Sequence, residues 1–255
     1  MPRFQIDPAK IRNNTVELDP KESHHAISVL RLKMDDAVEL MDGKGHSFHG
    51  VISDLRAGRV FIQISSGPKT PEGASDKSSN FFQITIAASV IKPERMELLI
   101  QKSCELGVAS IIPVRSERSI VKLSKERWEG KLRRWRKIAV ESCKQCGLPS
   151  TPEIHEVADF KSVIAKARAF DKIFIPTLLG VTKSFYESLQ KSAAGKILVL
   201  IGPEGDFSSK EVELAMSAGA VPVNLGPLIL RTETAAMYTL SVISFFYREI
   251  YNFKS

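Results

Sequence analysis

The start of the chain consists of short apolar runs separated by turn residues. The runs over 37–41, 47–53 and 59–64 have the length of β-strands, and Asp42-Gly43 between the first two is typical of a hairpin turn. A short helix is expected over 21–31. The pattern therefore predicts a small β-rich domain.

This pattern is lost over residues 67–80, where Gly, Pro and Ser are frequent and no hydrophobic periodicity remains. Such a composition is typical of a linker. We therefore expect two domains, one over residues 1–74 and one over residues 75–255.

Strand-like apolar runs alternate with helical stretches after the linker. Helices are expected over 94–106, 125–146 and 160–169, and strands over 82–91, 108–114, 171–176, 196–201 and 221–225. This alternation predicts an α/β domain with a mostly parallel sheet that is covered on both faces. In such sheets ligands bind beyond the carboxyl ends of the strands.

The expected helix over 125–146 carries Trp128 and Trp135 seven residues apart, with Leu132 between them and Ile138 after them. The spacing places these side chains on one helix face and favours a role in the core. Stacking on nucleic-acid bases is the alternative for the two indoles.

Composition narrows the class of protein. The chain has 255 residues, of which 43% are hydrophobic and 25% charged, as in soluble globular proteins. No apolar run approaches the roughly 18–20 residues that a membrane helix needs, and no signal-peptide pattern is present at the N-terminus. Cys143 and Cys146 form a CxxC without a second pair, which is poor evidence for a metal. We expect a cytoplasmic protein with no membrane segment and no metal site.

Positive charge is concentrated in one segment. The net charge is +7, and residues 115–137 alone hold six Arg, four Lys and three Glu, so that the rest of the chain is close to neutral. A localised positive field favours a polyanion such as nucleic acid. From composition alone, a solvated helix face explains the segment equally well.

The stretch IGPEGDF, residues 201–207, lies between an expected strand and an expected helix. Pro203 removes one backbone donor, Glu204 and Asp206 add negative charge, and no GxxxxGK[ST] pattern occurs, so phosphate is a poor fit. The glycines allow close backbone approach, and the carboxylates tolerate a neutral or cationic ligand. A plain turn followed by a capping box of Ser208 and Glu211 is the alternative.

A second Gly-Pro turn follows in LGPLILRTETAA, residues 225–236. The helix after it carries one apolar stripe, made of Ala236, Leu240, Ile243, Tyr247 and Ile250. Thr232 is expected as the N-cap, and Glu233 stands near the positive end of the helix dipole. Capping does not explain why Arg231 stands beside an apolar turn.

These two motifs, in this order and spacing, resemble the C-terminal motifs of SPOUT-class methyltransferases. The closer resemblance is to the RsmE family, the bacterial 16S ribosomal RNA uridine-N3 methyltransferases. It covers most of the chain, because HHAISVLRLK, IQKSCELGVASIIPVRSERS and KLRRWRKIAVESCKQCG also resemble RsmE segments.

The resemblance implies an α/β fold with a C-terminal trefoil-knotted SPOUT methyltransferase domain and an N-terminal PUA-like β-barrel that helps to hold RNA. It also implies a homodimer, S-adenosylmethionine as cofactor, and 16S rRNA within the small ribosomal subunit as substrate. The cofactor suits the residues, since it carries a sulfonium cation and an adenine but no phosphate. The alternatives are another RNA position for the same fold, and a non-catalytic RNA-binding ribosome-assembly factor.

The resemblance also suggests site residues. Those expected to bind the cofactor flank the carboxyl ends of three strands: Pro176, Thr177, Leu200, Ile201, Gly202, Pro203, Glu204, Gly205, Leu225, Gly226, Ile229 and Leu230. Because uridine N3 must lose a proton, Arg231 is the candidate that stabilises the ionised base, and Glu233 orients it, accepts the proton or only caps the helix.

RNA contacts are expected from basic residues in both domains, namely Arg3, Arg31, Arg118, Lys122, Arg133 and Arg134. His25 is expected to be a packed or surface histidine, with an RNA contact as the alternative. The chain departs from the family pattern at Asp206, where a second Gly is usual, and at Leu228, where Arg is frequent. Lys144 and Leu148 likewise stand where Glu and Arg are common.

Overall fold

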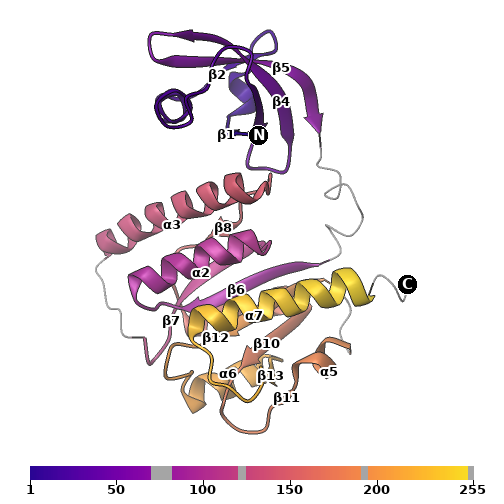
Figure 1. The fold of residues 1–255 in the computed structure, drawn as a ribbon. Coiled ribbons are helices and arrows are strands. Elements are labelled where there is room, and N and C mark those ends of the chain that lie inside the picture. Colours follow the sequence, from indigo (N-terminus) through magenta and orange to yellow (C-terminus); the bar gives the residue numbers. More distant parts are fainter. Residues whose placement is uncertain (70–81, 120–124, 191–194, 252–255) are drawn as a thin grey trace. The chain divides into compact units, whose positions relative to one another are not determined.

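The computed structural model describes residues 1–69, 82–119, 125–190 and 195–251 (Figure 1). The chain divides into two compact units, Met1–Asp76 with Val140–Thr151, and Lys77–Ala139 with Pro152–Ser255. The expected linker over 67–80 is wrong at its start, because residues 67–69 form the end of strand β5 (Arg59–Lys69), and the rest of it lies outside the described residues, as does Lys122.

The first unit is built on one five-stranded sheet. Its strand order is β1-β3-β4-β5-β2, and all neighbours are antiparallel except β1 and β3. The strands are β1 (Arg3–Gln5), β2 (Thr15–Glu17), β3 (Ala37–Met41), β4 (Ser47–Arg56) and β5 (Arg59–Lys69). The sheet confirms the expected β-rich domain and its hairpin, whereas the three-residue strands β1 and β2 are too short to leave a pattern in the sequence.

One helix covers the core of this unit. Helix α1 (Pro20–His24) begins at Asp19, whose carboxylate accepts hydrogen bonds from the amides of Lys21 and Glu22. A turn of π-helix, His25–Val29, continues it. The apolar faces of the strands pack with Ala26 into one buried cluster that includes Phe4, Leu40, Ile52 and Ile62.

The second unit is an α/β domain with a parallel sheet. The strand order is β11-β13-β10-β12-β6-β7-β8, with β9 also paired to β7, and every pairing is parallel. The strands are β6 (Gln83–Ser89), β7 (Ser110–Arg115), β8 (Glu153–Ile154), β9 (Ala158–Asp159), β10 (Lys172–Pro176), β11 (Lys183–Ser184), β12 (Lys196–Ile201) and β13 (Val221–Asn224). The expected parallel sheet is confirmed.

Helices cover both faces of this sheet. They are α2 (Pro93–Glu105), α3 (Lys125–Cys146), α4 (Phe160–Ala165), α5 (Phe185–Gln190), α6 (Ser209–Ser217) and α7 (Thr232–Phe245). Leu198 and Leu200 of β12 share a buried cluster with α4 and α6. The alternate residues of β12 point to the other face, where α7 packs on β6, β12 and α2 (Figure 1).

Helix ends follow the sequence signals closely. Gly107 and Gly147 come after α2 and α3 with φ values of +79° and +80°, a conformation that glycine adopts without a steric penalty. Helix α6 begins with the expected capping box, in which Ser208 and Glu211 bond to each other's amides. The core role is confirmed for Trp135, which is buried, while Trp128 is half-buried with its ring 6.2 Å from that of Trp135.

Candidate functional site

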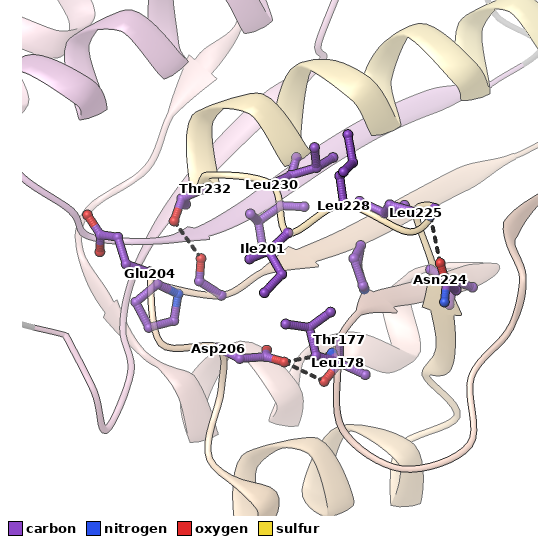
Figure 2. A pocket seen from close by; sticks show the side chains of 17 residues that line it. Thr177, Leu178, Ile201, Glu204, Asp206, Asn224, Leu225, Leu228, Leu230 and Thr232 are labelled. Carbon is purple, nitrogen blue, oxygen red and sulfur yellow. Dashed lines mark hydrogen bonds between the residues drawn. The ribbon is translucent and has the colours of Figure 1, made fainter.

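A cavity opens at the carboxyl ends of β10, β12 and β13 (Figure 2). It encloses about 580 Å³ when its open mouth is included. Ten of the residues expected to bind a cofactor line it, namely Pro176, Thr177, Ile201, Gly202, Pro203, Glu204, Leu225, Gly226, Ile229 and Leu230. Leu200 instead points into the core cluster, and Gly205 is exposed outside the cavity wall.

The IGPEGDF turn is shaped by close packing of its own backbone. A Cβ atom at Gly202 would lie 3.1 Å from the Phe207 amide nitrogen and 3.2 Å from Asp206 Oδ1, so glycine is what lets the turn close. The turn is fastened by the Asp206 amide, which donates to the Pro203 carbonyl oxygen at 2.9 Å.

Asp206 ties this turn to the loop that follows β10. Its Oδ2 accepts hydrogen bonds from Thr177 Oγ1 and from the Leu178 amide, both at 2.8 Å (Figure 2). Its Oδ1 accepts from the Phe207 amide at 2.7 Å. The carboxylate is thus surrounded by donors from two of the three loops that form the cavity.

Thr232 ties the same turn to helix α7. Its hydroxyl donates to the Gly202 carbonyl oxygen at 2.9 Å (Figure 2). The expectation that Thr232 caps the helix is wrong, since the N-cap is Arg231 and Thr232 is the first helical residue. The sequence misleads here because a hydroxyl at a helix start is usually used by the helix itself. In this fold the hydroxyl reaches across to the carboxyl end of β12.

The third loop is fastened by Asn224, which no sequence motif singled out. Its side-chain oxygen accepts a hydrogen bond from the Gly226 amide at 2.6 Å (Figure 2). Gly226 has a φ of +115°, which a residue with a side chain rarely adopts. Leu228 and Ile229 beyond it are largely exposed at the rim, at 74% and 77%.

The charge of the cavity wall is negative. Among its described lining residues none is Lys, Arg or His, and the two charged ones are Glu204 and Asp206. Arg95 of α2 pairs with Glu204 at 3.1 Å, and its Nε lies 3.9 Å from Glu233 Oε1. Sequence reasoning missed Arg95, because its partners follow it by more than a hundred residues along the chain.

Glu233 and Arg231 lie beside the cavity in contrasting states. Glu233 is buried in the first turn of α7, near the positive end of the helix dipole, and its Oε2 has no hydrogen-bond partner among the described residues. Arg231 is exposed and forms no side-chain hydrogen bond or ion pair in the described part of the chain. The start of α7 thus carries an exposed guanidinium without a partner in the described chain, on Arg231, and a buried carboxylate with one unbonded oxygen, on Glu233.

The basic residues of the second unit differ in the hydrogen bonds and ion pairs that they form within the protein. Arg118 is exposed and donates to the Gly205 carbonyl oxygen at 2.6 Å, so it touches the cavity turn from outside. Arg134 pairs with Glu97 at 2.5 Å, and its hydrogen bond lowers the pKa of that carboxyl. Arg133 is exposed.

The basic residues of the first unit are used in part by the fold. Arg3 pairs with Glu39 at 2.7 Å and donates to the carbonyl oxygens of Lys144 and Gln145, at 3.3 and 3.2 Å, at the end of α3. Arg31 is exposed with a φ of +55°.

Other candidates of the first unit are packed side chains. His25 packs edge-on against Phe4, with ring centroids 6.4 Å apart. In the described residues no group of His, Cys, Asp or Glu is arranged to hold a metal ion.

Lys144 is a buried cation. Its Nζ lies 2.6 Å from Glu22 and 3.0 Å from Glu141. Burial acts to lower the pKa of Lys144, but the hydrogen bonds and charges of the two carboxylates outweigh it, so that the pKa is raised. Leu148, the other residue singled out in this stretch, is half-buried.

Comparisons with known proteins identify the family. A family profile described as RNA methyltransferase domain matches residues 77–244, and one described as RNA methyltransferase PUA domain matches residues 18–65. The ribosomal RNA small subunit methyltransferase E of Bacillus subtilis is 29% identical over 238 residues, which cover 91% of this chain and 90% of the relative. The chain belongs to the RsmE family of RNA methyltransferases.

Solved RsmE-like structures have the same fold. A putative methyltransferase of Legionella pneumophila, solved in complex with the cofactor SAM, superposes with a TM-score of 0.81 at 32% identity, over 94% of this chain and 96% of that one. The RsmE protein of Neisseria gonorrhoeae bound to S-adenosyl methionine gives 0.82 at 29% identity, over 95% and 96%. None of the helices described here is both long and apolar enough to span a membrane.

Proposed function

We propose that this RsmE family member transfers a methyl group from S-adenosylmethionine to N3 of one uridine in 16S rRNA of the small ribosomal subunit. The observation that carries the proposal is the cavity of IGPEGDF and LGPLILRT at the carboxyl ends of three parallel strands. Relatives named for small-subunit ribosomal RNA methylation, one of them solved with the cofactor, support it.

The cavity fits this cofactor in size, shape and charge. Ile201, Leu225 and Leu230 provide apolar walls for an adenine ring, and the backbone of the Gly-containing turns offers polar atoms to its edge. Asp206 contributes negative charge, which suits a sulfonium cation and would repel a phosphate, whereas the charge of Glu204 is compensated by Arg95. When bound, the cofactor supplies an electrophilic methyl group attached to positively charged sulfur.

The residues at the start of α7 are the proposed catalytic groups that act on the uridine. A bond forms between N3 and the methyl carbon while the carbon–sulfur bond breaks, and N3 loses its proton. Arg231, which has no partner in the described chain, stabilises the negative charge on a uridine oxygen. Glu233 is the candidate acceptor of the proton, because its Oε2 is buried without a partner.

RNA is held by basic residues that the fold leaves exposed. Arg31, Arg118 and Arg133 are exposed, and we assign them to phosphate or base contacts together with Lys122, Arg3 and Arg134. Arg3 and Arg134 already pair with carboxylates, so their share in binding is smaller. The PUA family match supports an RNA-holding role for the domain over residues 1–74, and the methyltransferase match supports catalysis by residues 75–255.

Helix α7 supports a homodimer. Tyr238 and Phe245 are 43% and 60% exposed on the side of α7 that faces away from its own sheet. Two large exposed aromatic side chains on one side of a helix are typical of a surface that another protein covers, and a second copy of the chain is the proposed cover. Replacing both residues with serine is expected to convert a dimer to a monomer in sedimentation experiments.

The finer features of the fold are also proposals. A trefoil knot is supported by the path from β13, at the far side of β10, to α7, which packs on β6 and α2. A PUA-like barrel is supported by the family match over residues 18–65. Pulling both chain ends would test the knot, because a knotted chain stays shorter than about 3.5 Å per residue.

The function is tested by transfer of labelled methyl from S-adenosylmethionine to unmethylated small subunits, naked small-subunit RNA and tRNA in parallel. A methyl on N3 blocks the pairing edge, so reverse transcription stops at the modified nucleotide. We expect label on one uridine of the small-subunit RNA. Binding of RNA without label on any of the three would instead indicate a non-catalytic assembly factor.

A further inference from the structure

We propose that Asp206 is a positioning residue, which clasps the loop after β10 to the IGPEGDF turn and thereby sets the affinity of the cavity for its cofactor. The identity of the cofactor rests on the function proposed above, whereas the clasp itself does not.

The hydrogen bonds of Asp206 define the clasp. Thr177 Oγ1 and the Leu178 amide donate to Oδ2 at 2.8 Å each. Thr177 Oγ1 in turn accepts from the Leu179 amide at 3.1 Å, so three successive residues of the loop depend on one carboxylate. Hydrogen bonds to an ionised acceptor are stronger than neutral ones, and chains of them reinforce each other.

The backbone at Asp206 has a conformation that favours glycine. Its φ is +61°, in the left-handed region that glycine enters freely and that Asp tolerates better than most residues. Aspartate here accepts some backbone strain and gains three side-chain hydrogen bonds. A glycine at this position would keep the backbone conformation and lose the three bonds, so Asp206→Gly removes the clasp without adding strain.

Burial holds the clasped loop only in part. Thr177 is buried and Leu179 packs against the core cluster, whereas Leu178 and Val181 are 63% and 91% exposed. Pro176, Thr177 and Leu178 nevertheless line the cavity. A loop that is ordered before binding spares the cofactor the entropy of ordering it, which appears as a lower Kd.

The test compares Asp206→Gly, Asp206→Asn and Thr177→Val in the full chain, with Asp159→Asn as a matched control. Asp159 is exposed and pairs with Arg115, away from the cavity residues. Binding of S-adenosylmethionine is measured by calorimetry, and methyl transfer by labelling of small subunits. Hydrogen exchange of the Leu178 and Leu179 backbone amides is measured in protein without cofactor.

Asp206→Gly is expected to raise the Kd for S-adenosylmethionine about tenfold and to affect KM for the cofactor more than turnover, since only the ordering of the loop is lost. Thr177→Val should raise the Kd about threefold. Adding it to Asp206→Gly should have a less than additive effect, because the bond between Thr177 and Asp206 is already lost and only the bond from the Leu179 amide is lost in addition. Asp206→Asn should lie between wild type and Asp206→Gly, because one amide oxygen replaces two carboxylate oxygens.

Faster exchange of the Leu178 amide in Asp206→Gly tests the clasp even if the chain does not bind this cofactor. Unchanged exchange and a Kd within twofold of wild type would overturn the inference, as would fully additive effects of the two substitutions. Absence of cofactor binding by wild type, with exchange still dependent on Asp206, would overturn the proposed function and leave the clasp standing.

Discussion

The cavity loops of the second unit and the end of α3 in the first unit are fastened by different interactions. Around the cavity, Thr232 and Asn224 use neutral side chains that bond to backbone groups a few ångströms away. In the first unit, Lys144 is buried between Glu22 and Glu141, and Arg3 bonds to the last carbonyl oxygens of α3. Asp206 adds a carboxylate to these cavity fasteners, but its partners are neutral donors, namely the Thr177 hydroxyl and the Leu178 and Phe207 amides.

The charged arrangement carries the larger risk when it is disturbed. A buried ion pair barely outweighs the cost of taking its charges out of water, yet removal of one partner leaves an uncompensated charge. Loss of a neutral hydrogen bond leaves only an unsatisfied polar group. The two units should therefore respond to single substitutions by different amounts.

The largest effect on stability is expected from Lys144→Met. The substitution leaves the buried carboxylate of Glu22 without its cationic partner. We therefore expect the free energy of unfolding of the first unit to fall by about 3 kcal/mol. Hydrogen exchange of the β4 and β5 amides measures this loss. Trp128 and Trp135 both lie in the second unit, so their fluorescence does not report on it.

Lys21→Met is the matched control, since Lys21 is exposed and 3.6 Å from Glu141. If Lys144→Met and Lys21→Met lower the free energy of unfolding equally, the ammonium of Lys144 is not buried in solution. The double variant Glu22→Gln with Lys144→Met should recover part of the loss, because no unpaired charge remains.

Arg231→Ala tests the proposed role of Arg231, whose guanidinium forms no hydrogen bond or ion pair within the described chain. We expect a roughly 100-fold loss of methyl transfer, typical of removing one donor that stabilises developing negative charge. Turnover on small subunits is the measurement, with the melting temperature as a check on folding. Lys210→Ala, an exposed residue of α6, is the control. Normal methylation by Arg231→Ala would remove this residue from the mechanism.

Thr232→Val tests the neutral fastening. The variant keeps the shape of the side chain and loses its bond to the Gly202 carbonyl oxygen, so we expect about 1 kcal/mol of destabilisation of the second unit. Thermal unfolding followed by tryptophan fluorescence measures it. Thr234→Val, at an exposed position of the same helix, should have almost no effect. Equal effects would mean that helix propensity explains the loss.

The smallest effect concerns the surface pair of Glu97 and Arg134. The hydrogen bond from Arg134 lowers the pKa of Glu97 below its ordinary value of 4.5, so the stability that this pair contributes is present above that pH and is lost as the pH falls through the lowered value. We expect wild type and Arg134→Ala to differ slightly at pH 7 and to converge in acid. A constant difference from pH 7 to pH 2 would contradict it.

The sequence predicted the parts of the site whose residues are neighbours along the chain. The two Gly-Pro turns, the capping box of Ser208 and the alternating strands and helices each leave a local pattern, and the structure has them at the expected places. Arg95, by contrast, meets Glu204 across 109 positions, and Lys144 meets Glu22 across 122. Nothing in the local spacing of these residues indicates their partners.

The prediction that Thr232 caps α7 was wrong, and the side chain of Leu200 faces the core cluster and not the cavity. Thr232 can cap its own helix or reach another loop, and only the placement of β12 beside α7 decides between them. Leu200 belongs to the right strand but points to the opposite face from Ile201, because side chains alternate along a strand. Tertiary placement, which no short stretch of sequence contains, settled both.

The strand order has a consequence for the synthesis of the chain. Strand β6 pairs with β7 on one side soon after both are made, but its other neighbour is β12, which starts at Lys196. At about 5–20 residues per second, β12 leaves the ribosome roughly 6 to 23 s after β6. Throughout that interval the edge of β6 that will pair with β12, which includes Ile84 and Ile86, lacks its partner strand. An unpaired edge strand can pair with other chains, so the nascent chain most needs chaperones during this period.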